Sequence, residues 1–339
     1  MSGAEPPGDA VAKDSVDEFD WIAHDLRPLA AGAPEAFDLL DDAAAIASRP
    51  GFDLIVSKDA IVEGVHFLPD DPMDLVARKL LRVNLSDLAA KGAEPYGYFL
   101  AVAWPGERSR AERAAFAAGL KADQDKFGLH LLGGDTVSTP GPFTASLTIL
   151  GWTPAGAMVR RATAQVGDVV LVSGTIGDGG LGLAAARSEL AVPAADAAWL
   201  ADRYRLPQPR LALGEPLRRW AHAAADVSDG LIADAGRICI ASEVGMEIDL
   251  GRMPLSAPAA GWLAAQADRT AGLVRLATGG DDYEIVCTAP SDAVSALKAG
   301  AVAAGVPLTE IGRVTADSDV RVSANGAPVV IASAGYRHG

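Results

Sequence analysis

Aspartate residues recur in this chain where a short apolar run ends or where a pair of glycines bends the backbone. Asp135 follows Gly133-Gly134, and Asp281-Asp282 follows Gly279-Gly280. One such pair alone is ordinary turn chemistry, because an aspartate hydrogen-bonds its own backbone there. The repetition is more informative, since strand ends in layered sheets converge on one crevice. We therefore expect carboxylates from distant segments to gather in space. The other aspartates in comparable positions are Asp41, Asp42, Asp59, Asp226 and Asp229.

A gathered set of carboxylates needs positive charge around it, because like charges repel. Mg²⁺ is the natural cation, since it takes hard oxygen ligands and shares them with nucleotide phosphates. A helical aspartate joins this set: Asn84, Asp87 and Lys91 are spaced by three and four residues and so share one helical face. The alternative interpretation of that polar stripe is a solvated outer face.

Short apolar runs alternate with helical segments in both halves of the chain, which indicates α/β or α+β layers. Ser109 and Glu112 form a capping box, and Gly92 and Gly128 are placed to end helices. Strict alternation over 143–149 predicts a half-exposed antiparallel strand. The expected strands are 52–57, 130–132, 143–149, 169–172, 224–227 and 283–288. The expected helices are 72–91, 109–128 and one that follows residue 230 and ends near residue 245.

The length of 339 residues favours two domains. The periodic pattern breaks at 151–161, so we predict an N-terminal α/β domain at 17–153 and a C-terminal α/β domain at 154–339. The preceding segment, 1–16, is acidic and lacks an apolar core, so we expect a disordered tail there.

Charge and composition exclude several classes of protein. Lys and Arg total 29 against 44 Asp and Glu, a formal charge of -15, which disfavours nucleic acid and anionic membranes as partners. The two cysteines, Cys239 and Cys287, are too few for a disulfide framework or a cysteine zinc site. We find neither a secretory signal nor an apolar stretch able to span a bilayer, so we expect a cytoplasmic protein.

The common phosphate-binding and hydrolase motifs are missing. The chain has no G-x-x-x-x-G-K-[ST] motif, and no glycine-rich loop with the H-R-D and D-F-G partners of protein kinases. It also lacks G-x-S-x-G, and its five histidines are dispersed. A P-loop fold, a protein-kinase fold and a serine hydrolase are therefore disfavoured.

An ordered series of motifs instead runs along nearly the whole chain. Its members are 18–22 (EFDWI), 41–44 (DDAA), 57–59 (SKD), 62–67 (VEGVHF), 83–90 (VNLSDLAA), 133–136 (GGDT), 173–178 (SGTIGD), 226–231 (DVSDGL), 279–284 (GGDDYE) and Gly335-Tyr336. In this order the motifs resemble the thiamine-monophosphate kinase family, part of the superfamily that includes aminoimidazole ribonucleotide synthetase. The string around His66 separates this family from its superfamily relatives.

The resemblance implies a two-domain aminoimidazole ribonucleotide synthetase-like fold whose N-terminal sheet pairs with its twin in a homodimer. It also implies an active site in the cleft between the domains. There ATP would phosphorylate thiamine monophosphate to thiamine diphosphate, with several Mg²⁺ ions held by an aspartate cluster.

Matching positions assign roles to individual residues. The implied metal ligands are Asp42, Ser57, Lys58, Asp59, Asp87, Asp135, Asp226 and Asp229. The implied ATP contacts are Gly134, Asp135, Arg161 and Ser228. The implied contacts to thiamine phosphate are His66, Asp281 and Tyr336. Two positions depart from the family pattern: Lys58 replaces a threonine, so that only a backbone carbonyl would remain as a metal ligand, and Leu40 replaces a glycine.

The expected reaction is direct in-line phosphoryl transfer, because the attacking oxygen of the substrate phosphate is already ionised and needs no general base. One rival is another ATP-using enzyme of the same superfamily, which would leave the motif around His66 unexplained. A second rival is a non-catalytic protein that binds thiamine phosphates or divalent metal. Magnesium-dependent release of ADP on addition of thiamine monophosphate separates catalysis from binding.

Overall fold

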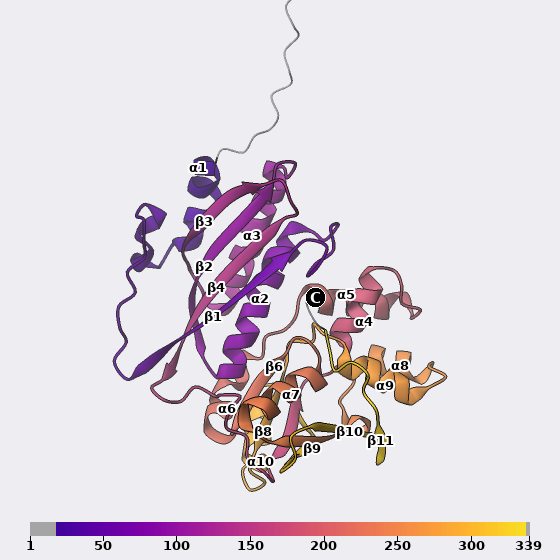
Figure 1. Ribbon diagram of the computed structural model, residues 1–339. Helices are drawn as coiled ribbons and strands as arrows, with labels where there is room; N and C mark the ends of the chain where they lie inside the picture. The colour runs from indigo at the N-terminus through magenta and orange to yellow at the C-terminus, as the bar shows by residue number, and fades with distance from the viewer. Residues whose placement is uncertain (1–17, 337–339) are drawn as a thin grey trace, which may run out of the picture.

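The computed structural model describes residues 18–336, and two layered parts of the chain are each built on a β-sheet (Figure 1). The predicted tail at 1–16 lies outside the described residues. The strands of the first sheet end at Pro154 and those of the second begin at Val169. The exact domain boundary, which we place at 153/154, stays a prediction.

The first part is a four-stranded sheet in the order β1-β4-β2-β3, in which only β2 and β3 run parallel. Helices α2 and α3 pack on one face, where buried Phe143 contacts Trp104 and Phe116 edge-to-face. The elements are α1 (Glu18–Trp21), three short helical turns (Ile22–Leu26, Arg27–Ala30, Pro34–Leu39), β1 (Phe52–Val62), α2 (Met73–Lys91), β2 (Glu94–Pro105), α3 (Arg110–Phe127), β3 (Leu131–Thr139) and β4 (Thr144–Pro154).

The predicted helices of this part are confirmed together with their caps. Ser109 accepts a hydrogen bond from the Glu112 backbone and Glu112 bonds back, which completes the capping box of α3. Gly92 and Gly128 end the two helices in left-handed conformations, with φ of 68° and 70°. The predicted alternating strand is also confirmed, because β4 is antiparallel to both β1 and β2.

Three of the predicted strands are too short, and one of them is β4, which continues beyond its predicted end at 149 to Pro154. Strand β1 continues through Asp59 to Val62, because every residue from Phe52 onward pairs with β4. Strand β3 continues through Gly133, Gly134 and Asp135, whereas the sequence pattern predicts that the strand ends before them. Gly134 is required there by sheet packing, because a Cβ atom at this position would lie 1.9 Å from the Leu100 carbonyl oxygen of β2.

The second part is a seven-stranded mixed sheet in the order β11-β10-β7-β9-β5-β8-β6. Helices cover both faces, so strands such as β5 are buried at every position. The elements are β5 (Val169–Ser173), α4 (Asp178–Ala186), α5 (Ala194–Arg205), a short turn (Leu211–Leu213), α6 (Gly214–Trp220), β6 (Ala223–Val227), α7 (Leu231–Ser242), β7 (Gly245–Asp249), a short turn (Leu250–Arg252), α8 (Ala257–Ala264), α9 (Arg269–Thr278), β8 (Glu284–Ala289), α10 (Val294–Ala303), β9 (Leu308–Thr315), β10 (Val320–Ala324) and β11 (Ala327–Val329). The strands predicted in this half are confirmed to within a residue at each end, and helix α7 ends three residues before the predicted position.

Helix α2 connects the two parts, and Figure 1 shows its last turns beside β6 and α6 of the second part. Buried Arg82 pairs with Asp123 of α3 and donates hydrogen bonds to the carbonyls of Leu206 and Pro207. Lys91 donates to the carbonyl of Ala224 at 2.8 Å. These bonds position the acidic segments of both parts against each other. Within residues 18–336, none of the helices combines the length and the apolarity needed to cross a bilayer.

Candidate active site

A cavity of about 560 Å³ lies where the two parts meet, and it brings together most of the predicted site. Asp59 of β1 and Asp87 of α2 line it from the first part, and Asp226 and Asp229 line it from the second. The other predicted residues on its wall are Ser57, His66, Arg161, Ser228, Asp281 and Tyr336. The cavity thus contains carboxylates that are far apart in the sequence.

The polar stripe of α2 holds β1 in place at this cavity. Buried Asn84 accepts a hydrogen bond from the Asp59 backbone N–H at 3.1 Å and donates to the carbonyl of Leu80. Asp87 accepts a hydrogen bond from the Ser57 hydroxyl at 2.5 Å. The stripe is therefore an inward-facing face of the helix, and the alternative of a solvated outer face is wrong.

On the opposite wall, Asp234 shapes the turn that carries Asp229. Its Oδ2 atom accepts hydrogen bonds from the backbone N–H groups of Ser228, Asp229 and Gly230, at 3.0, 3.0 and 3.2 Å. Its Oδ1 atom accepts a hydrogen bond from Arg237, which also pairs with Asp229. Our sequence analysis missed Asp234. Its position in the first turn of a helix, where a carboxylate can bind free N–H groups, was the available signal.

The cavity carboxylates are crowded. Burial, together with the charges of Asp87 and Asp229, raises the pKa of Asp59 to about 6. Burial and the charges of Asp87 and Asp234 raise the pKa of Asp226 to about 8. Both shifts mean that ionisation is opposed by low polarity and by neighbouring negative charge. A cation bound between these groups would remove that opposition.

The end of the cavity near His66 contains a buried cation that our sequence analysis did not identify. The Lys79 ammonium donates to the His66 carbonyl at 2.9 Å and lies 3.5 Å from an Asp281 oxygen. It also lies 3.6 Å from the centre of the Tyr204 ring. Burial lowers the pKa of Lys79, while Asp281 opposes that change. Tyr336 is positioned at the cavity by its backbone N–H, which donates to the Asp229 carbonyl.

The segment that carries Asp281 is held in a strained conformation. Asp281 and Tyr283 have positive φ angles of 68° and 50°, which are unfavourable for residues other than glycine. Their backbone N–H groups donate to the carbonyls of Ser228 and Val227, both at 2.8 Å. These two bonds fasten the segment to the end of β6 and so fix Asp281 at the cavity wall.

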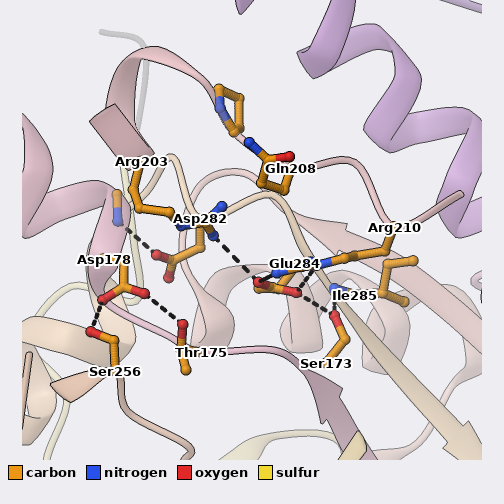
Figure 2. A network of polar contacts seen from close by, with 12 residues as sticks. Ser173, Thr175, Asp178, Arg203, Gln208, Arg210, Ser256, Asp282, Glu284 and Ile285 are labelled. Atoms are coloured by element: carbon orange, nitrogen blue, oxygen red, sulfur yellow. Dashed lines mark hydrogen bonds and ion pairs between the residues drawn. The ribbon is translucent and has the colours of Figure 1, made fainter. Parts of the chain in front are cut away.

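A buried polar network stabilises the same segment from behind (Figure 2). Asp282 accepts hydrogen bonds from the N–H groups of Gly177 and Gly179, both at 2.8 Å. Glu284, fully buried, accepts from Ser173 and pairs with Arg210 and Arg203. The glycine-rich segment at 173–180 therefore packs against the acidic segment at 279–284.

Three further predicted residues, Asp42, Gly134 and Asp135, lie in a second pocket of about 430 Å³. Strand register explains the separation. Asp135 pairs with Ala101, which pairs with Ser146, which pairs with Ala60, so these residues share one face of the sheet. Asp59 is the neighbour of Ala60 and therefore lies on the opposite face. A single chain does not bring Asp42 and Asp135 into the first cavity.

Lys58 lines neither pocket. It stands between Ser57 and Asp59 in β1, so its side chain lies on the other face, where the ammonium is 3.4 Å from the Thr148 hydroxyl. Leu40, the other departure from the family pattern, is exposed.

The oxygen donors of the first cavity suit Mg²⁺. In the part of the chain that the structure describes, no three His, Cys, Asp or Glu side chains are arranged as a ready metal site. A preformed cage is not expected for this ion, because Mg²⁺ at kinase sites takes one or two carboxylates and completes its shell with water and substrate phosphates. Asp59, Asp87, Asp226 and Asp229 would be the holders on the protein side.

Two family models together match most of this chain. Residues 40–153 match the family model described as AIR synthase related protein, N-terminal domain, and residues 165–325 match the model of its C-terminal domain. A thiamine-monophosphate kinase of Caulobacter vibrioides is 52% identical, over 99% of this chain and 95% of the relative. The thiamine-monophosphate kinase of Escherichia coli K12 is 41% identical, over 84% of this chain and 86% of the relative.

Two solved structures have the same architecture. The crystal structure of a thiamine-monophosphate kinase from Stenotrophomonas maltophilia superposes with a TM-score of 0.76 at 38% identity, over 86% of this chain and 91% of that chain. A structure described as AaThiL complexed with AMPPCP and TMP superposes with a TM-score of 0.73 at 27% identity, over 85% of this chain and 90% of that chain.

Proposed function

This chain belongs to the AIR synthase related family and, within it, to the thiamine-monophosphate kinases, and from this we propose that it transfers the γ-phosphate of ATP to thiamine monophosphate. The observation that supports the proposal best is the first cavity, where Asp59, Asp87, Asp226 and Asp229 from both parts meet His66, Asp281 and Tyr336. The related structure complexed with AMPPCP and TMP supports the choice of both substrates.

The reaction is an in-line displacement. An oxygen of the thiamine monophosphate phosphate attacks the γ-phosphorus, a new P–O bond forms, and ADP leaves with the electrons of the broken bond. Asp59, Asp87, Asp226 and Asp229 would hold Mg²⁺, which would supply positive charge to neutralise the transferring group. Asp281 carries a negative charge suited to the thiazolium ring of the acceptor, and Arg161 provides a positive charge for the nucleotide phosphates. The acceptor oxygen is ionised at neutral pH, so no side chain is needed as a general base.

The second pocket can contribute to the reaction if two copies of the chain pair through the first sheet. The face that carries Asp135 also presents exposed Ala60, Ala101 and Val137. A second sheet packed there would bury these apolar groups. In such a homodimer the second pocket of one subunit would complete the first cavity of its partner, so that Asp42 and Asp135 act across the interface.

A direct assay tests the function. Purified protein is incubated with MgATP and thiamine monophosphate, and thiamine diphosphate is measured by chromatography and mass spectrometry. We expect stoichiometric ADP and thiamine diphosphate, no product after chelation of Mg²⁺, and no product from thiamine, which lacks the attacking phosphate. Binding of thiamine monophosphate without ADP release would favour a binding protein. Turnover with a different acceptor would favour another superfamily enzyme, and labelled phosphate on the protein would exclude direct transfer.

A further inference from the structure

Two cations lie near the carboxylates of the first cavity, Lys91 outside its lining and Arg237 on its wall. The proposed reaction gives neither of them a role. Lys91 lies on α2 one helical turn after Asp87. Its ammonium donates to the carbonyl of Ala224 at 2.8 Å, two residues before Asp226. Lys91 is therefore held at the junction of the two parts, within electrostatic reach of both Asp87 and Asp226.

Arg237 lines the cavity itself. It projects from α7, and its guanidinium pairs with Asp229 through one nitrogen and with Asp234 through another. Its side chain is 40% exposed and lines the cavity. The pairing with Asp229 occupies an oxygen that our proposal assigns to a metal ion.

We propose that Lys91 and Arg237 are internal counter-cations, which hold the carboxylates together before nucleotide and metal arrive and thereby set the affinity of the cavity for divalent ions. The inference rests on the metal role that we propose for Asp87, Asp226 and Asp229. A fixed positive charge offsets repulsion among carboxylates in the metal-free protein, and it repels a divalent cation that enters the same site.

This arrangement has two linked consequences. Loss of either cation should lower the stability of the metal-free protein, because the carboxylates then repel each other more strongly. It should also strengthen divalent-ion binding, because the positive side chain no longer repels the metal ion or occupies the carboxylate oxygens. By linkage, a ligand that binds more tightly restores more stability. A cation with only a packing role would affect stability to the same extent with and without metal.

The first test is titration of the full-length protein with Mn²⁺ in the absence of nucleotide, with free Mn²⁺ measured by electron paramagnetic resonance. We expect K91M and R237Q each to bind Mn²⁺ about three- to tenfold more tightly than the wild type, as loss of one nearby charge at a partly solvated site implies. K91R and R237K should stay close to the wild type. R219Q removes an exposed charge that does not line the cavity and controls for net charge.

Unchanged or weaker Mn²⁺ binding by K91M and R237Q would overturn the inference and leave the proposed function standing. Absence of Mn²⁺ binding by the wild type without nucleotide would overturn the inference alone, because substrate phosphates can complete the metal site; the Mg²⁺ dependence of turnover tests the metal role separately. If a variant is too unstable for the titration, its melting temperature is measured in EDTA and in saturating Mg²⁺. We expect both variants to melt below the wild type in EDTA, with a smaller difference in Mg²⁺. An equal difference in both conditions would identify a packing role and overturn the inference.

Discussion

The two acidic pockets of this protein differ in what surrounds their carboxylates. In the first cavity, Asp59 and Asp226 are enclosed by elements of both parts, and their pKa values are raised to about 6 and about 8. In the second pocket, Asp42 and Asp135 are exposed. The first group is assembled by the folding of one chain, whereas the second lies on a sheet face that carries exposed apolar residues. Similar sequence motifs can therefore supply two different kinds of surface.

The most severe test of this difference is Asp87→Asn. Asp87 lines the first cavity, and asparagine there keeps the shape of the side chain but loses its charge. We expect kcat/KM to fall on the order of a thousandfold, as loss of a preorganised electrostatic contact does. The melting temperature should not fall, because a repelling charge is removed from a crowded group. Kinetics and thermal unfolding measure both, and turnover near that of the wild type would remove Asp87 from the metal-binding set.

Asp135→Asn tests the second pocket, and we expect a smaller loss, on the order of a hundredfold. Mixing the two variants shows whether Asp135 acts in its own subunit or in its partner. Dimers formed from D87N and D135N subunits contain one intact site if Asp135 acts across the interface, so random mixing should restore about a quarter of wild-type activity. If Asp135 acts within its own chain, each site of a mixed dimer keeps one substitution and no activity returns. Refolded mixtures assayed for thiamine diphosphate distinguish these results.

A milder test concerns the end of the first cavity near His66. Lys79→Met removes the ammonium that joins the His66 carbonyl to Asp281, so both segments lose a shared contact. We expect KM for thiamine monophosphate to rise about tenfold and KM for ATP to change less than about twofold, since misplacement of a positioning group costs this much or more. Equal effects on both substrates would mean that Lys79 only supports the fold. K79R serves as the charge-retaining control.

Much of the fold could be predicted because its signals are local. The capping box at Ser109 and the glycines that end α2 and α3 depend on residues a few positions apart. The lengths of β1, β3 and β4 could not be predicted, because pairing with a neighbouring strand decides where each of them ends. Polar residues and glycines in those strands look like loop residues until the partner strand is known.

The candidate site was predictable in its members and less so in its arrangement. The motif series identified residues such as Asp59 and Asp135, but strand alternation puts these two on opposite faces. Asp234 and Lys79 escaped attention because their importance comes from contacts with distant backbone atoms. A side chain that acts through a remote carbonyl or N–H group leaves little trace in the sequence around it.

Helix α2 belongs to the first sheet in sequence, yet Arg82 and Lys91 fasten it to backbone carbonyls of the second part. If the chain were divided between the two sheets, one fragment would expose the cations of α2 to water. The other fragment would contain carbonyl groups that have lost their hydrogen-bond donors. The two sheets should melt in one transition, and neither half is a promising unit for recombination with a foreign partner.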